Sequence, residues 1–169
     1  RTRDRILFVN QFKVDGVAVL TPYFSKFSQA ELVTYYQMLA DESKAPVYLY
    51  DLPAVAGVKI ATETLVELAK HPTIRGATCS ADFSDTRQSI DAVPEDFRVI
   101  VAQPHLLDVL IRHGAREHLD GVWAIMPKWT VALGKCADEG DWAGAAEYQQ
   151  LITAVRSLLV SKYGFGSFS

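Results

Sequence analysis

The stretch Val47-Tyr48-Leu49-Tyr50-Asp51-Leu52-Pro53 decides the fold class. Its first four residues form an unbroken apolar and aromatic run, which is typical of a parallel strand covered on both faces. Runs of the same kind occur at residues 17–20, 73–78, 97–102 and 121–126. We therefore predict five parallel strands.

Helical patterns lie between these runs. Ser28 and Glu31 form a capping box ahead of apolar residues at helical spacing. Thr62 and Ser84 are predicted to cap the next two helices. Asp141 is predicted to cap a long last helix over residues 142 to about 163. Regular alternation of strand and helix indicates an α/β protein, and residues 1–169 are predicted to form one domain.

Strand–helix repetition leads either to a doubly wound sheet or to a (β/α)₈ barrel. No Gly-x-Gly-x-x-Gly pattern follows any predicted strand, which disfavours a dinucleotide-binding sheet. A complete barrel needs roughly 250 residues and eight strands. Five strand–helix units would leave open sheet edges and an uncovered apolar interior. The fold is therefore either an open five-stranded sheet or a barrel whose N-terminal part lies outside this sequence.

The composition of the chain argues against two classes of binding partner, nucleic acid and membrane. Hydrophobic residues make up 49% and charged residues 22%, with a net charge of −3 and no basic cluster, so nucleic acid is not an expected partner. No apolar run approaches the roughly 18 residues of a membrane span, so no membrane contact is expected. Two cysteines are too few for a disulfide framework, so we expect a cytoplasmic protein. Because the chain opens at Arg1, we expect that the natural start precedes it.

Three segments stand out as motifs. They are a strand-end motif, a Tyr-x-x-Pro motif and the approach to the next strand: Leu20-Thr21-Pro22-Tyr23-Phe24, Tyr50-Asp51-Leu52-Pro53-Ala54-Val55-Ala56-Gly57-Val58-Lys59 and His71-Pro72-Thr73-Ile74-Arg75-Gly76. Together they resemble the motifs of the dihydrodipicolinate synthase and N-acetylneuraminate lyase family, whose version of the second reads Tyr-Asn-x-Pro. Their order and spacing also match. The resemblance implies a TIM barrel, of which this chain would supply strands four to eight and the C-terminal helices. The first three strand–helix units would then precede Arg1.

The resemblance also implies a chemistry and a departure from it. In the family, a lysine on the sixth strand forms a Schiff base with pyruvate or a related 2-oxo acid, and a tyrosine on the fifth strand moves protons. Tyr50 matches that tyrosine. The position of the lysine is occupied by Thr78, whose hydroxyl cannot form an imine. Tyr50 and Thr78 are therefore the candidate catalytic positions, and normal Schiff-base chemistry is not expected.

Other candidate site residues come from the same resemblance. The candidate substrate-binding residues are Tyr23, Ala54, Val55 and Gln103. The second tyrosine of the strand-four motif is Phe24 here, and Val55 stands where the synthases place an arginine. Ala54, Val55 and the Val58-Lys59 pair are more similar to the lyase and sugar-acid aldolase branch of the family. The resemblance implies a small 2-oxo acid or sugar acid as ligand, no cofactor, no metal, and a homo-oligomer, either a dimer or a tetramer.

Three functional readings remain open. The first is a lyase or aldolase of the family with altered or very weak chemistry. The second is a catalytically silent homologue that binds a ligand or assembles with an active paralogue. The third is a different barrel enzyme with a metal site built from Asp51, Asp82 and His105, although no tight ligand spacing supports it. Lys59 and Lys128 are the lysines near predicted strand ends that could replace the missing amine.

Overall fold

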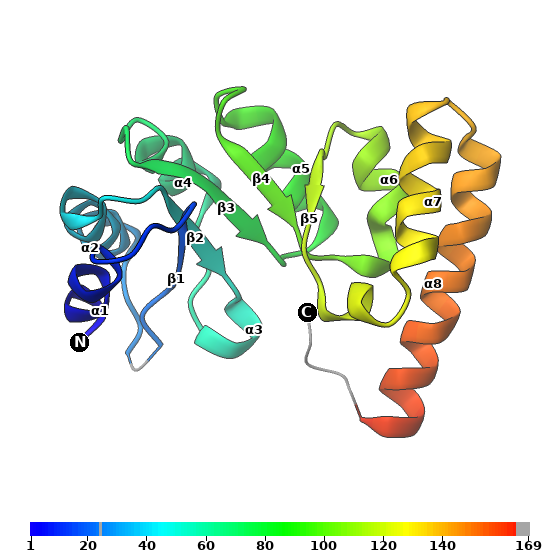
Figure 1. The fold of residues 1–169 in the computed structure, drawn as a ribbon, viewed down its shortest axis with the longest axis horizontal. Coiled ribbons are helices and arrows are strands. Elements are labelled where there is room, and N and C mark those ends of the chain that lie inside the picture. Colours follow the sequence, from blue (N-terminus) through cyan, green and yellow to red (C-terminus); the bar gives the residue numbers. More distant parts are fainter. Residues whose placement is uncertain (24, 165–169) are drawn as a thin grey trace. The chain divides into compact units, whose positions relative to one another are not determined.

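A computed structural model describes residues 1–23 and 25–164 and divides into two compact units, Arg1–Val99 and Ile100–Ser169 (Figure 1). The first unit contains α1 (Thr2–Val9), β1 (Val17–Leu20), α2 (Gln29–Glu42), β2 (Val47–Asp51), α3 (Pro53–Ala56), α4 (Thr62–Leu68), β3 (Ile74–Cys79) and α5 (Phe83–Ala92). Strand β4 (Arg98–Val101) begins in the first unit and ends in the second. The second unit continues with η1 (Pro104–Leu106), α6 (Leu107–Arg112), β5 (Glu117–His118), η2 (Gly121–Ala124), α7 (Pro127–Asp138) and α8 (Trp142–Tyr163).

The sheet of the first unit is parallel, as predicted. Val17 pairs with Val47 in the β1–β2 register, and Tyr50 pairs with Thr78 in the β2–β3 register. Strands that follow one another in sequence are neighbours in the sheet. Each of the first three predicted strands is confirmed to within one residue at either end. Parallel strands joined by helices are the arrangement of a βαβ unit.

Burial alternates along β2 rather than covering both faces. Val47 and Leu49 are fully buried, whereas Tyr48 and Tyr50 are only partly buried. The buried side chains join a core that includes α2 and α4 residues such as Leu32, Leu39, Leu65 and Leu68. Because side chains alternate between the faces of a strand, Tyr48 and Tyr50 lie on the face turned away from this core. The run in the sequence is continuous because the aromatic rings of Tyr48 and Tyr50 were counted as apolar, although these two side chains are only partly buried.

Two of the predicted helix starts are corrected. The capping box is confirmed: Glu31 N donates to Ser28 Oγ (3.3 Å), and Ser28 N donates to a Glu31 carboxylate oxygen (2.8 Å). Thr62, however, is the first residue of α4 and hydrogen-bonds to the Ser89 hydroxyl at 3.2 Å. Helix α5 is capped by Asp82, not by Ser84, because Asp82 has the extended backbone of a cap and accepts from Asp85 N at 2.9 Å.

The second unit corrects the last predicted strand. Strand β5 comprises only Glu117 and His118, paired in parallel with Ile100 and Val101 of β4. The apolar segment predicted as a strand at 121–126 instead begins with the 3₁₀-helix η2. Asp120 caps this turn by accepting a hydrogen bond from Val122 N at 2.8 Å. The strand escaped prediction because its two residues are polar.

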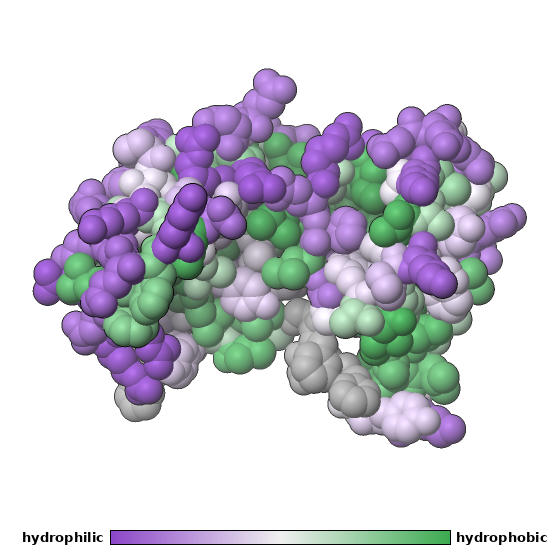
Figure 2. Space-filling model, in the orientation of Figure 1, coloured by the Kyte–Doolittle hydropathy of each residue, from purple (hydrophilic) through white to green (hydrophobic). Residues whose placement is uncertain are grey.

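Helices α7 and α8 pack side by side in the second unit (Figure 1). Asp141 caps α8 as predicted, by accepting a hydrogen bond from Gly144 N at 2.9 Å. Apolar side chains gather over the C-terminal half of α8 (Figure 2). A groove of about 500 Å³, lined by residues 124–129 and Val155, also lies in this unit. Over the residues described, no helix has the length and apolar character needed to cross a membrane.

Candidate functional site

Tyr50 and Thr78 lie side by side near the carboxyl ends of neighbouring strands. They are register partners in the β2–β3 pair. Their chain neighbours Leu49 and Ala77 belong to the buried core, so Tyr50 and Thr78 share the opposite face of the sheet. Tyr50 is partly buried, and Thr78 is only 3% exposed. The two candidate catalytic positions are therefore brought together, as predicted.

The Thr78 hydroxyl is held by the backbone of the adjacent strand. Asp51 N donates a hydrogen bond to Thr78 Oγ1, with an N–O distance of 3.1 Å. The carbonyl of Asp51 in turn accepts from the Ser80 hydroxyl at 2.7 Å. These two bonds fix the ends of β2 and β3 to each other. Thr78 thus presents a small hydroxyl group that is held in place at the end of β3.

Asp51 is a buried carboxylic acid beside this pair. It is 2% exposed, and its Oδ1 accepts a hydrogen bond from Ile60 N at 3.1 Å. Burial raises the pKa of Asp51 to about 6, against the opposing effects of the Ile60 hydrogen bond and of the Lys59 charge. Since Asp51 follows Tyr50, its side chain lies on the face that carries the helices. It fastens the segment after α3 to the end of β2.

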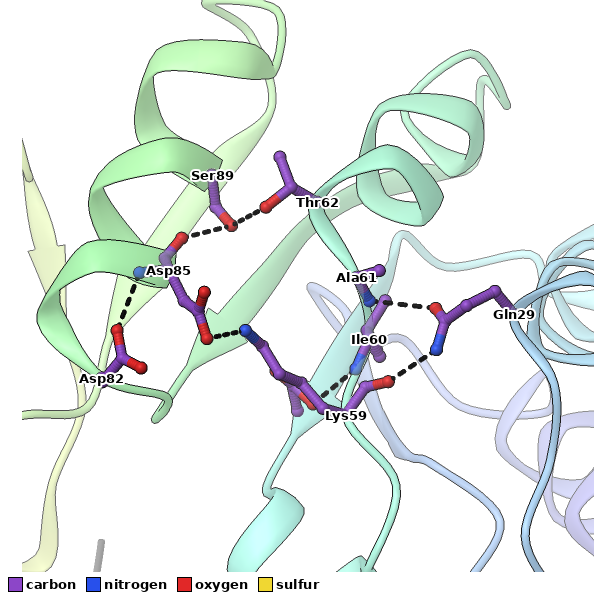
Figure 3. A network of polar contacts seen from close by, with 9 residues as sticks. Gln29, Lys59, Ile60, Ala61, Thr62, Asp82, Asp85 and Ser89 are labelled. Carbon is purple, nitrogen blue, oxygen red and sulfur yellow. Dashed lines mark hydrogen bonds and ion pairs between the residues drawn. The ribbon is translucent and has the colours of Figure 1, made fainter.

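Lys59 is engaged in an ion pair. Its ammonium group contacts the carboxylate of Asp85, which belongs to α5 (Figure 3). The Lys59 side chain is 35% exposed, so this lysine is partly enclosed and does not project freely into solvent. The side-chain nitrogen of Lys59 is therefore engaged by a neighbouring carboxylate.

Gln29 was not singled out from the sequence, yet it clamps the same segment from the other side (Figure 3). Its Nε2 donates to the Lys59 carbonyl at 2.9 Å, and its Oε1 accepts from Ala61 N at 2.9 Å and from the Thr64 hydroxyl at 2.7 Å. A primary amide suits this position because it carries both donors and an acceptor. No motif marks such a residue, since two of its three partners are backbone groups and all three lie far along the chain.

The predicted substrate-binding residues of the first unit lie after two different strands. Ala54 and Val55 are exposed in the short helix α3, directly after β2, and Val55 is 60% exposed. Gly57 closes α3 with a φ of 70°, a conformation that favours glycine. Tyr23 follows β1, is 68% exposed, and lines a groove of about 720 Å³ beside β1 and α1. Phe24 lies outside the described residues.

The second unit contains the remaining candidates. Gln103 is buried directly after β4, and His105 is exposed in η1. Lys128 was expected to follow a strand, but it is an exposed residue in the first turn of α7. Its place in that helix removes the reason for treating it as a strand-end lysine.

The polar groups of the described residues do not form a metal site. No cluster of three or more histidine, cysteine or acidic side chains suited to a metal ion occurs among them. Asp51 and Asp82 accept hydrogen bonds from backbone amides of Ile60 and Asp85. Cys79 is not suited to act as a nucleophile either. Burial raises the pKa of its thiol to about 12, and the thiolate is the nucleophilic form of cysteine.

Parallel strands that follow one another in sequence and are joined by helices, with polar side chains at the ends of β2 and β3, are typical of α/β proteins of the barrel class. The sequence profile of the dihydrodipicolinate synthetase family matches residues 9–167. The chain therefore belongs to that family.

Individual relatives agree with this assignment. A 4-hydroxy-tetrahydrodipicolinate synthase of Exiguobacterium sp. is 34% identical over 132 residues, which is 78% of this chain and 45% of the relative. A "DapA-like lyase" of Halobacterium salinarum is 31% identical over 146 residues, or 86% of this chain and 48% of the relative. The chain thus spans about half the length of the curated relatives it matches.

Solved structures show the same fold. YagE of E. coli K12, a prophage protein of the family solved in complex with pyruvate, has a TM-score of 0.88 and 27% identity. The match covers 97% of this chain and 57% of YagE. A 2-keto-3-deoxygluconate aldolase variant of Sulfolobus solfataricus has a TM-score of 0.86 and 23% identity, covering 99% of this chain and 55% of the aldolase. The fold is therefore that of a TIM barrel, of which this chain supplies about half.

Proposed function

We propose that this protein binds a 2-oxo acid or a sugar acid at the strand ends around Tyr50 and Thr78, and that it does so without forming a Schiff base. The ligand class is taken from relatives: YagE was solved with pyruvate, and another structural neighbour is a 2-keto-3-deoxygluconate aldolase. The hypothesis that accounts for both this ligand class and the missing Schiff base is a lyase or aldolase of the family with an altered reaction.

One observation carries the proposal, namely that Thr78 is the register partner of Tyr50. The residue beside the family's tyrosine position therefore offers a hydroxyl oxygen and no amine. An imine requires a nitrogen nucleophile, so none can form at this position. Tyr50 keeps a hydroxyl that can donate to a bound ligand.

We do not expect Lys59 to supply the missing nitrogen. Lys59 is paired with Asp85, and its nitrogen would have to leave that carboxylate before it could attack a carbonyl. We therefore expect no migrated Schiff-base lysine at this site.

Borohydride trapping tests the proposal. The purified protein is incubated with pyruvate and, separately, with 2-keto-3-deoxygluconate, then reduced and weighed by intact mass spectrometry. We expect no adduct, whereas ligand-observed NMR should detect reversible binding of at least one acid. A 4-hydroxy-tetrahydrodipicolinate synthase treated in parallel is the positive control. A reduced adduct that maps to Lys59 or Lys128 would overturn the claim of non-covalent binding, and no binding of either acid would overturn the ligand class.

We also propose that the protein self-associates through the segment that follows β1. Tyr23 is a large side chain that is 68% exposed, and exposed aromatic residues are enriched at protein interfaces. Sedimentation velocity at micromolar concentration should show a dimer or tetramer, and Tyr23→Ser should shift the distribution toward monomer. A monomer in the unmodified protein would contradict this proposal.

A further inference from the structure

We infer that the Thr78 hydroxyl donates a hydrogen bond to the carbonyl oxygen of the bound 2-oxo acid, beside the hydroxyl of Tyr50, so that the ketone is held and polarised without a covalent bond. This inference rests on the proposed function and specifies how its ligand is recognised. It gives Thr78 a role in binding, where the sequence indicated only a lost lysine.

The direction of the Asp51 hydrogen bond carries the argument. A hydroxyl group has one hydrogen and two lone pairs. Thr78 Oγ1 uses a lone pair to accept the Asp51 amide hydrogen at 3.1 Å. Within residues 1–23 and 25–164, this is the hydrogen bond that the side chain makes, so its own hydrogen is not engaged there. A buried donor without an acceptor is costly, and a ligand oxygen would satisfy it.

The side chain of Thr78 lies on the same face of the sheet as Tyr50. The opposite face carries Leu49 and Ala77, which accept no hydrogen bond, and the Asp51 carboxyl, which already accepts from Ile60 N. Tyr50 stands next to Thr78 on the same face, in register with it. Two hydroxyl groups on adjacent strands can converge on one acceptor atom.

The hydroxyl groups of Thr78 and Tyr50 favour a ketone as the ligand group that they bind. A ketone oxygen accepts hydrogen bonds and donates none, so it suits two donors, whereas an ammonium group does not. Donors aimed at a carbonyl oxygen in a site shielded from water polarise that bond, as in an oxyanion hole. Thr78 is 3% exposed, which favours a strong hydrogen bond. The inferred recognition therefore depends on the 2-oxo group itself.

A ligand-by-variant comparison tests this inference. Dissociation constants of pyruvate and of propionate, which lacks the 2-oxo group, are measured by ligand-observed NMR for the unmodified protein, Thr78→Val and Thr78→Ser. We expect the preference for pyruvate over propionate to fall by about five-fold in Thr78→Val, the effect of one lost neutral hydrogen bond, and to be kept in Thr78→Ser.

Each other result has a definite meaning. An unchanged preference in Thr78→Val overturns the inference and leaves the proposed function standing. Equal binding of the two acids by the unmodified protein does the same. No binding of pyruvate to the unmodified protein removes both the inference and pyruvate as the ligand of the proposed function.

Infrared spectroscopy of bound pyruvate labelled with carbon-13 at the ketone gives an independent reading. The ketone stretch should lie at lower frequency in the unmodified protein and in Thr78→Ser than in Thr78→Val. Should Thr78→Val not fold, Thr78→Cys replaces it, because a thiol is a weaker donor. A ketone band at the same frequency in every folded variant overturns the inference.

Discussion

The amide nitrogen of Asp51 and the side-chain oxygen of Thr78 lie 3.1 Å apart, in a hydrogen bond that joins the ends of β2 and β3. Thr78 therefore contributes to the structure of the sheet end as well as to the candidate site. Valine matches its shape but offers no acceptor, and serine keeps the acceptor but loses a methyl group. The two substitutions separate these contributions.

We expect Thr78→Val to lower the free energy of unfolding by about 1–2 kcal/mol, because the buried Asp51 amide loses its acceptor. Thr78→Ser should lose less, since its hydroxyl can still accept. Urea denaturation of the three proteins at neutral pH checks this prediction. Equal stability of Thr78→Val and the unmodified protein would show that the bond makes no net contribution.

The raised pKa of Asp51 predicts that the free energy of unfolding depends on pH in an unusual direction. Its pKa in the folded protein, about 6, lies above the ordinary carboxyl value of 3.8, so the folded state binds the proton more tightly than the unfolded state. The stability that this group contributes is present below pH 4 and is lost as the pH rises through about 6. The difference corresponds to about 3 kcal/mol at most.

The variant Asp51→Asn tests this pH dependence. An asparagine side-chain oxygen can still accept from Ile60 N, but it carries no charge to desolvate. The variant should gain stability relative to the unmodified protein between pH 5 and pH 7, as measured by urea denaturation. A stability difference that stays constant over this range would contradict the raised pKa of Asp51.

Gln29→Glu should destabilise the segment around Lys59 although the two side chains have the same shape. A carboxylate can accept from Ala61 N and from Thr64, but it cannot donate to the Lys59 carbonyl and would face that oxygen across a contact of 2.9 Å. We expect a loss of about 1–3 kcal/mol. Faster amide exchange at Ala61, with little change at Leu39 in the core, would identify the effect as local. Unchanged exchange at Ala61 would remove the assigned role of Gln29.

Thr78→Lys should introduce the amine that the unmodified protein lacks. With Tyr50 as its register partner, the new side chain would stand where the proposed ligand binds. We expect borohydride to trap pyruvate on this variant, with the adduct mapping to position 78. The variant Thr78→Arg is the matched control, because it is long and cationic but forms no imine at neutral pH. Equal adduct formation in both variants would contradict the assignment of this position.

Several features were settled by the sequence because they depend on neighbouring residues. The apolar runs determined β1, β2 and β3, and the Ser28–Glu31 spacing determined the start of α2. The Tyr-Asp-Leu-Pro and His-Pro motifs indicated the family that the profile match then showed. Local signals misled where two cap residues competed, as at Asp82 and Ser84, and where a strand was short and polar, as at β5.

The tertiary structure alone decided what each side chain touches. The sequence named Tyr50 and Thr78, but it did not show that the Thr78 oxygen accepts from Asp51 or that Lys59 is held by Asp85. Both contacts join residues 26 or more positions apart, between elements that only folding brings together. Gln29 is the clearest case: its partners lie 30 to 35 residues away and are mostly backbone atoms. Backbone groups are the same in every residue, so no pattern of side chains along the chain can reveal such a clamp.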